Sequence, residues 1–140
     1  MLLAGLDNDV TLIEGVESIS GKSQLKTLFD FFSRVPHINK VLFVWDCDAS
    51  YPLLEINHTY PFFFSINSAN TIARNGIENL FPTALFDDFL KTITLSQGKV
   101  ITEFDETRKR DFERHVLSSP IANVFSNFEP LVEKIRSLLK

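Results

Sequence analysis

Hydrophobic residues recur along the first half of the chain in patterns that predict a parallel α/β arrangement. The apolar run at 41–45, which is followed by Asp46, predicts a strand over 41–46 that is buried on both faces. Shorter β-branched or aromatic runs predict strands at 10–14 and 60–66, and apolar residues spaced i, i+3, i+4 and i+7 predict a helix over 22–35. We therefore expect a βαβ unit in which strands 10–14 and 41–46 are parallel and joined by a right-handed crossover.

The second half of the chain alternates between shorter polar and apolar segments. We expect, in order, a short helix at 82–89 with Leu85, Phe86 and Phe89 facing inward, hairpin strands at 91–95 and 99–104, a helix from the N-cap Asp105 to about Leu117, and a last helix capped by Asn127. The expected fold class is α/β: a parallel sheet with flanking helices, followed by a β-hairpin and two C-terminal helices. Residues 1–140 should form a single domain, with an α/β half to about residue 66 and a mixed α+β half over 67–140.

The composition is that of an ordinary folded domain. The chain has 140 residues, 44% of them hydrophobic, and its 14 Phe predict a bulky aromatic core. The net charge of −4 argues against nucleic-acid binding by bulk electrostatics. No stretch has the roughly 20 apolar residues needed to cross a bilayer. The single cysteine excludes an internal disulfide. We expect a cytoplasmic protein with no membrane partner.

Basic residues are concentrated in one place, the predicted helix that begins at Asp105. They are Arg108, Lys109, Arg110, Arg114 and His115. Such a run is typical of a solvated helix face, and a local contact to nucleic acid is the weaker alternative.

Two acidic residues end the run at 41–46. Asp46 and Asp48 are two positions apart, so their side chains point the same way if the extended backbone continues through Cys47. No Lys or Arg lies between Val41 and Leu53 to neutralise them, and a divalent cation would do so. The alternative is that these carboxylates cap the next element or face solvent. Cys47 alternates away from both and is expected to be a buried structural thiol.

A third acid, Glu14, ends the predicted strand 10–14. Because the carboxyl ends of parallel strands meet at one edge of a sheet, Glu14 should lie near Asp46. The alternative is that Glu14 hydrogen-bonds within the loop that leads into the helix.

The Asp46-Cys47-Asp48 strand, the preceding βαβ unit and the segment Gly76-Ile77-Glu78-Asn79-Leu80 resemble the Toprim domain. The similarity is greatest to the Toprim-like domains of the OLD (overcoming lysogenisation defect) ATP-dependent nucleases, whose closing segment is also similar to residues 124–131. The resemblance implies a Rossmann-like parallel sheet. Glu14-Gly15 has the dipeptide of a further family motif, but its position suits the family's second strand. Either the domain is shortened and Glu14 serves as the family's Glu, or the chain is a fragment whose first strand and its Glu precede Met1. We favour the fragment.

The resemblance implies a chemistry as well as a fold. Asp46, Asp48 and Glu78 would hold Mg²⁺ or Mn²⁺ for the cleavage of a phosphodiester. The family's Glu acts as the general base or acid, and in this chain only Glu14 could take that role beside Asp46 and Asp48. It also implies DNA as the substrate of the parent protein. An ATPase domain of the same or a neighbouring chain would be the partner.

Two other interpretations remain open. Asp46-x-Asp48-x-Ser50 is similar to the nucleophile motif of haloacid-dehalogenase-type phosphatases, in which Asp46 would attack phosphorus and Asp48 would act as acid and base. That interpretation ranks lower because no Lys is well placed. The third is a module without catalysis that docks a partner through the aromatic segment 60–64.

Overall fold

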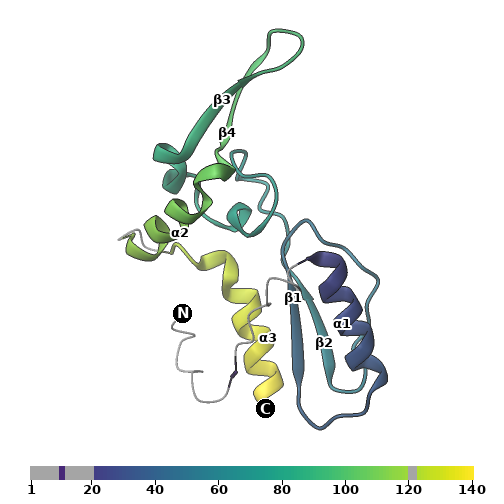
Figure 1. Ribbon diagram of the computed structural model, residues 1–140. Coiled ribbons are helices and arrows are strands. Elements are labelled where there is room, and N and C mark those ends of the chain that lie inside the picture. Colours follow the sequence, from purple (N-terminus) through teal and green to yellow (C-terminus); the bar gives the residue numbers. More distant parts are fainter. Residues whose placement is uncertain (1–9, 12–20, 120–122) are drawn as a thin grey trace. The chain divides into compact units, whose positions relative to one another are not determined.

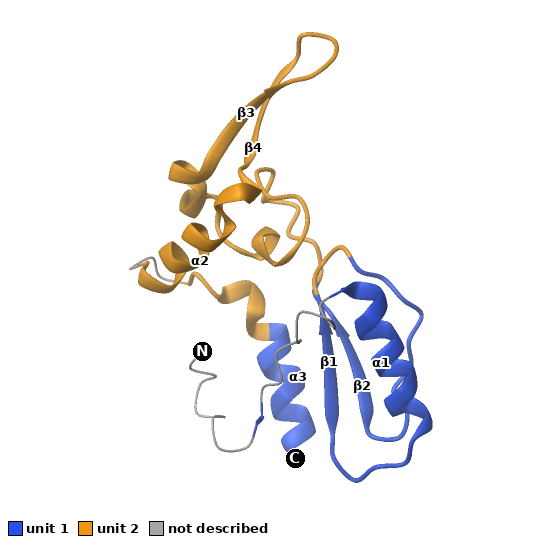
Figure 2. Ribbon diagram, in the orientation of Figure 1, with its two compact units in different colours: residues 1–45, 49–64, 130–140 blue, residues 46–48, 65–129 orange. Residues whose placement is uncertain are grey.

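The computed structural model describes residues 10–11, 21–119 and 123–140, which combine helices with one parallel and one antiparallel strand pair (Figure 1). Its internal contacts divide these residues into two compact units (Figure 2). Unit 1 consists of the residues up to Trp45 together with Ala49–Phe64 and Pro130–Lys140, and unit 2 of Asp46–Asp48 and Ser65–Glu129. The mixed α and β composition expected from the sequence is confirmed, whereas the single-domain organisation stays a prediction.

Unit 1 is built on a parallel strand pair. Strand β1 (Val41–Trp45) pairs with β2 (Thr59–Phe63) in a register that runs from Val41 opposite Thr59 to Trp45 opposite Phe63. Helix α1 (Lys22–Arg34) lies beside the pair and confirms the helix predicted at 22–35 (Figure 1). The carboxyl ends of β1 and β2 therefore lie at the same edge of the sheet.

Aromatic rings hold α1 against the sheet. Phe29 of α1 is 3% exposed, and its ring centre lies 5.4 Å from that of Phe43 and 5.8 Å from that of Trp45. Trp45 in turn stacks on Phe63 across the strand pair, with 4.8 Å between ring centres. The high Phe content thus forms the bulky core that it predicts.

The last helix, α3 (Glu129–Leu139), belongs to unit 1 from Pro130 onward. Polar contacts connect it to other segments of that unit. The Lys40 ammonium donates to the Leu138 carbonyl, and Lys134 pairs with Glu55. The Lys134 ammonium also lies 5.4 Å from the centre of the Tyr60 ring, a cation–π contact.

Unit 2 has a second aromatic core beneath a hairpin. Strands β3 (Leu90–Thr94) and β4 (Val100–Phe104) are antiparallel, as predicted, with Leu90 opposite Phe104. They follow a 3₁₀ helix (Thr83–Phe89) whose Leu85, Phe86 and Phe89 are all buried, which confirms their inward orientation.

Helix α2 (Lys109–Ser118) closes this core. Phe112 of α2 stacks on Phe86 with 4.4 Å between ring centres. A 3₁₀ turn (Glu106–Arg108) leads into α2, and Asp105 caps it by accepting hydrogen bonds from the Thr107 hydroxyl and N–H. The hydroxyl bond is the main reason that the pKa of Asp105 lies below its ordinary value. Asp105 is therefore a cap, as predicted, but of the 3₁₀ turn; α2 itself begins after Arg108.

Three predictions about local structure differ from what is observed. Val10 and Thr11 have no regular structure, and the rest of the predicted strand 10–14 lies outside the described residues. Strand β1 is not buried on both faces, because Val44 is 36% exposed while Phe43 and Trp45 are buried. Asn127 does not cap the last helix. It lies within a 3₁₀ turn (Ser126–Phe128), and its side-chain amide donates to the Leu80 carbonyl at 2.6 Å.

None of the described helices combines the length and the apolar character that crossing a membrane requires.

Candidate functional site

The two predicted metal ligands lie directly after β1. That strand ends at Trp45, whose carbonyl accepts a hydrogen bond from Phe64 N at 3.2 Å just past the end of β2. Asp46 is half-buried and Asp48 is exposed. Cys47 and Asp48 form a turn, so the extended backbone does not continue through Cys47 as the sequence argument assumed. The alternation of a strand therefore does not set the directions of the two carboxylates.

Cys47 is buried, as predicted, and is 8% exposed. Its thiol lies 3.2 Å from the Gly76 carbonyl and 3.5 Å from Asn79 Oδ1, and it donates toward both oxygens. The turn that carries Asp46 and Asp48 is thereby attached to the turn at 76–79, the segment that supplies the predicted ligand Glu78.

The backbone of this second turn depends on a glycine. Gly76 has φ 73° and ψ −176°, a region that only glycine occupies readily. It precedes a 3₁₀ helix (Ile77–Leu80), and its carbonyl accepts a hydrogen bond from Asn79 N at 3.2 Å. A Cβ atom at this position would lie 2.7 Å from Glu78 Oε2. The resemblance uses Gly76 only as a sequence match, but the structure gives it a conformational reason.

Buried amides tie the turn to the preceding loop. Asn79 is 0% exposed. Its Oδ1 accepts from Asn67 N at 2.7 Å, and its Nδ2 donates to the Ala73 carbonyl at 2.8 Å. Asn70 is 4% exposed and donates to the Phe81 carbonyl at 3.0 Å. The repeated Asn residues in the stretch 67–71 are the sequence signal for this network.

Glu78 is buried and already has a cationic partner. Its Oε1 lies 2.7 Å from Lys109 Nζ, with the Glu78 side chain 8% exposed and that of Lys109 50%. Burial works to lower the pKa of Lys109, but the contact with Glu78 and its charge outweigh burial and raise the pKa above 10.5. In this structure the carboxylate therefore serves an ion pair between the 76–79 turn and α2.

The predicted acids do not assemble into a closed metal shell. Across residues 10–11, 21–119 and 123–140, no three or more His, Cys, Asp or Glu side chains come close enough to share an ion. Glu14 lies outside the described residues. Asp46 and Asp48 remain as two carboxylates at the end of β1, and Ser50, which completes the phosphatase-like motif, is exposed.

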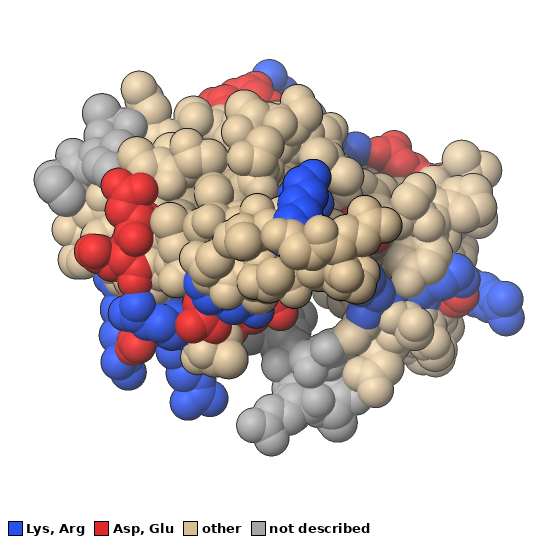
Figure 3. All heavy atoms as spheres, turned by 90° about the horizontal axis from the view of Figure 1, so that it is seen from above, with Lys and Arg blue, Asp and Glu red and all other residues tan. Residues whose placement is uncertain are grey.

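The basic stretch is largely engaged within unit 2. Besides Lys109, the Arg108 guanidinium lies 4.7 Å from the centre of the Phe89 ring and donates to the Asp88 carbonyl. Arg114 lies 3.6 Å from Asp111. On the face drawn in Figure 3, basic and acidic groups lie next to one another. The ion pairs of Lys109 with Glu78 and of Arg114 with Asp111 agree with a solvated helix face and give no support to a nucleic-acid patch.

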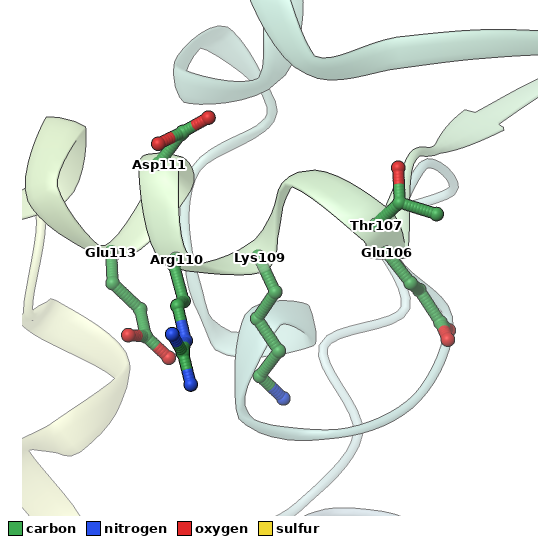
Figure 4. Close-up of a pocket in the computed structure, with 6 residues that line it drawn as sticks. All are labelled: Glu106, Thr107, Lys109, Arg110, Asp111 and Glu113. Carbon is green, nitrogen blue, oxygen red and sulfur yellow. The ribbon is translucent and has the colours of Figure 1, made fainter.

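A shallow pocket of about 560 Å³ lies along the start of α2. Figure 4 shows Lys109, Arg110 and Glu113 on one side of the helix and Asp111 on the other. All of its lining residues come from the single stretch 106–113, and apart from the neutral Thr107 they are a mixture of acidic and basic side chains. It therefore lacks the convergent groups from several elements that a binding site needs.

Comparisons with protein-family models, with curated proteins and with solved structures give no match to this chain.

Proposed function

We propose that the chain is a divalent-metal-dependent phosphoryl-transfer domain, the DNA-cleaving Toprim-like part of a larger OLD-like ATPase. The observation that carries the proposal is the position of Asp46 and Asp48. They flank a buried residue immediately after a strand of a parallel pair, the edge at which open α/β sheets bind ligands. The finer assignment to a Toprim arrangement rests on the sequence resemblance.

The donor chemistry of the site suits Mg²⁺ or Mn²⁺. Both cations prefer carboxylate oxygens, and Mg²⁺ keeps several waters that a phosphate can displace. Because Asp46 is half-buried and Asp48 exposed, a cation held by them would remain open to substrate. When bound, the cation would stabilise charge on the phosphate and make a water more acidic.

In this proposal Asp46 and Asp48 would hold the cation, which would supply charge stabilisation for the phosphodiester. The oxygen of a water forms a bond to phosphorus while the bond from phosphorus to the leaving sugar oxygen breaks. The water loses a proton and the leaving oxygen gains one. The resemblance assigns this proton transfer to the family's Glu, for which only Glu14 could stand in within this chain.

Glu78 Oε1 is already paired with Lys109 Nζ, so this oxygen would bind a metal only if the ion pair opened. The Lys109 side chain is half-exposed and can turn into solvent, whereas Glu78 is buried and held by its turn. A Glu78→Gln variant separates the two roles. A ligand role predicts weaker Mn²⁺ binding, and a purely structural role predicts unchanged Mn²⁺ binding with lower stability.

The test begins with binding and ends with cleavage. Calorimetry with Mn²⁺ should show a site that Asp46→Asn and Asp48→Asn weaken. The full chain, alone and with its ATPase partner, should nick supercoiled plasmid, and either variant should reduce the rate by about 10²-fold. Asp87→Asn is the matched control, since Asp87 is an exposed aspartate of the same unit. A metal-loaded complex that does not cleave DNA refutes the nuclease assignment.

A docking module without catalysis is the second candidate, and exposed apolar side chains of unit 1 favour it. Ile38 is 92% exposed and Leu54 80%. The segment first considered for docking is a weaker choice, because residues 60–63 are half-buried and Phe64 is buried. A pure docking module would give no heat with Mn²⁺, and Ile38→Asp or Leu54→Asp would weaken its binding to the ATPase domain.

A further inference from the structure

We infer that Cys47 is a positioning residue for the metal ligands, because its thiol fixes the Asp46–Asp48 turn to the rigid turn at 76–79. The inference rests on the proposed function, since it concerns how Asp46 and Asp48 are held for a cation. It assigns no catalytic role to the thiol. Gly76 and Asn79, whose oxygens accept from the thiol, help to position the ligands in the same way.

The geometry at Cys47 supports this role. The thiol points at two fixed oxygens, Gly76 O at 3.2 Å and Asn79 Oδ1 at 3.5 Å. A thiol is a weak donor, but Cys47 is 8% exposed and water does not compete freely for these acceptors. One acceptor is a backbone carbonyl and the other belongs to a buried side chain, so both hold the thiol in a defined position.

Both acceptors are themselves held in place. Gly76 O also accepts from Asn79 N at 3.2 Å, and the Asn79 side chain is fixed by Asn67 N at 2.7 Å and by the Ala73 carbonyl at 2.8 Å. Asn79 is 0% exposed. The 76–79 turn is therefore a rigid support rather than a loop that follows Cys47.

The position of Cys47 matters to both aspartates because it lies between them. Each peptide bond of Cys47 is shared with one aspartate, so a shift of Cys47 moves both carboxylates together. Strand alternation does not set their directions, since Cys47 and Asp48 form a turn after β1 ends. In place of the strand, the thiol contact ties the segment that carries the two ligands to the 76–79 turn. Residues that orient metal ligands typically change metal affinity by 10-fold or more when they are replaced.

The experiment compares Mn²⁺ affinity across three full-length variants by calorimetry. Cys47→Ala should weaken Mn²⁺ binding by about 10-fold. Cys47→Ser keeps a donor and should recover most of that loss. Val116→Ala is the control, because Val116 is buried in α2 of the same unit and its truncation should lower stability without changing Mn²⁺ affinity.

A spectroscopic readout separates positioning from general stability. Because the chain has one cysteine, its S–H stretching band reports this thiol alone. Mn²⁺ should shift the band in the wild type, and Asp46→Asn should abolish the shift. If Mn²⁺ binds but neither Cys47→Ala nor the band responds, the inference is wrong and the metal site stands. If the wild type binds no Mn²⁺, the proposed function fails and takes the inference with it.

Discussion

Unit 2 contains two turns in which a glycine has the same positive φ but different surroundings. Gly76 and Gly98 both have φ 73°. At Gly76 an added Cβ would lie 2.7 Å from a buried carboxylate oxygen, whereas at Gly98 it would meet nothing within 4 Å. The turn at 76–79 is surrounded by buried amides, while the turn at 95–99 joins the exposed ends of β3 and β4. The local backbone requirement is shared, but only one turn is also constrained by its neighbours.

This difference shows where the structure uses its polar groups. The hairpin turn closes through its own backbone, with Leu95 N donating to the Lys99 carbonyl at 2.8 Å and Gly98 N to the Leu95 carbonyl at 2.9 Å. The 76–79 turn instead receives side chains from Asn67, Asn70 and Cys47. A turn that receives distant side chains supports other segments, and its replacement should affect more than itself.

The largest effect is expected for Asn79→Leu. The change removes the acceptor of Asn67 N and the donor to the Ala73 carbonyl, which leaves buried polar groups unsatisfied. At about 1–3 kcal/mol for each such group, the free energy of unfolding should fall by about 4 kcal/mol. Urea denaturation measures the loss. Asn75→Leu is the control, because Asn75 is exposed, and it should change stability by less than about 0.5 kcal/mol.

Gly76→Ala should follow at about 3 kcal/mol. The backbone strain of a side chain at this φ and ψ contributes about 1–3 kcal/mol. The close approach to Glu78 Oε2 adds to it, because that carboxylate is buried and paired with Lys109 and moves only by disturbing the pair. Hydrogen exchange should show lost protection at 76–79 and at 46–48. Protection unchanged at 46–48 would mean that the two turns are not coupled.

Much of the fold could be predicted because its signals are local. The spacing of apolar residues predicted α1, the polar break at 96–98 predicted the hairpin, and Asp105 marked the start of the following helical stretch. Each of these features is decided within a few residues along the chain. The turn after Trp45 ends the expected alternation of side-chain directions at Asp46 and Asp48. No local sequence pattern predicted this turn.

The candidate site was only partly predictable because its contacts link distant residues. The Asp46 and Asp48 positions followed from the apolar run before them. The pairing of Glu78 with Lys109 and the thiol contact of Cys47 with Gly76 join segments that are far apart in sequence and follow no period. An Asn-rich stretch also predicts a loop whether its amides face water or a core. Whether the amides face water or a core depends on their burial, which cannot be read from the local sequence.

Lys109→Met tests the charge at the buried turn. It leaves Glu78 buried without its cation, and since Lys109 is half-exposed we expect a loss of about 2 kcal/mol, less than for a fully buried pair. Lys99→Met on the exposed hairpin turn is the matched control and should cost less than about 0.5 kcal/mol. Chemical denaturation of both variants at neutral pH gives the comparison. Equal losses would show that Glu78 does not need the ammonium.

The ion pair of Lys109 with Glu78 also predicts how the free energy of unfolding changes with pH. Because folding raises the pKa of Lys109 above 10.5, the folded state holds this proton more tightly than the unfolded state. The stabilisation is complete below pH 10.5 and is lost as the pH rises through the folded pKa. Wild type should therefore lose more stability than Lys109→Met between pH 10 and the alkaline end of the titration. Parallel pH profiles would contradict the assignment.

Gly98→Ala should have the smallest effect, about 1 kcal/mol. It carries the same φ strain as Gly76→Ala, but nothing surrounds the added Cβ atom, so backbone strain is the whole cost. Gly98→Asn should cost less still, because Asn tolerates positive φ. Urea denaturation of the two alanine variants side by side separates backbone strain from crowding. If Gly98→Ala were as costly as Gly76→Ala, the buried carboxylate would contribute nothing, and the special role of the 76–79 turn would reduce to glycine conformation alone.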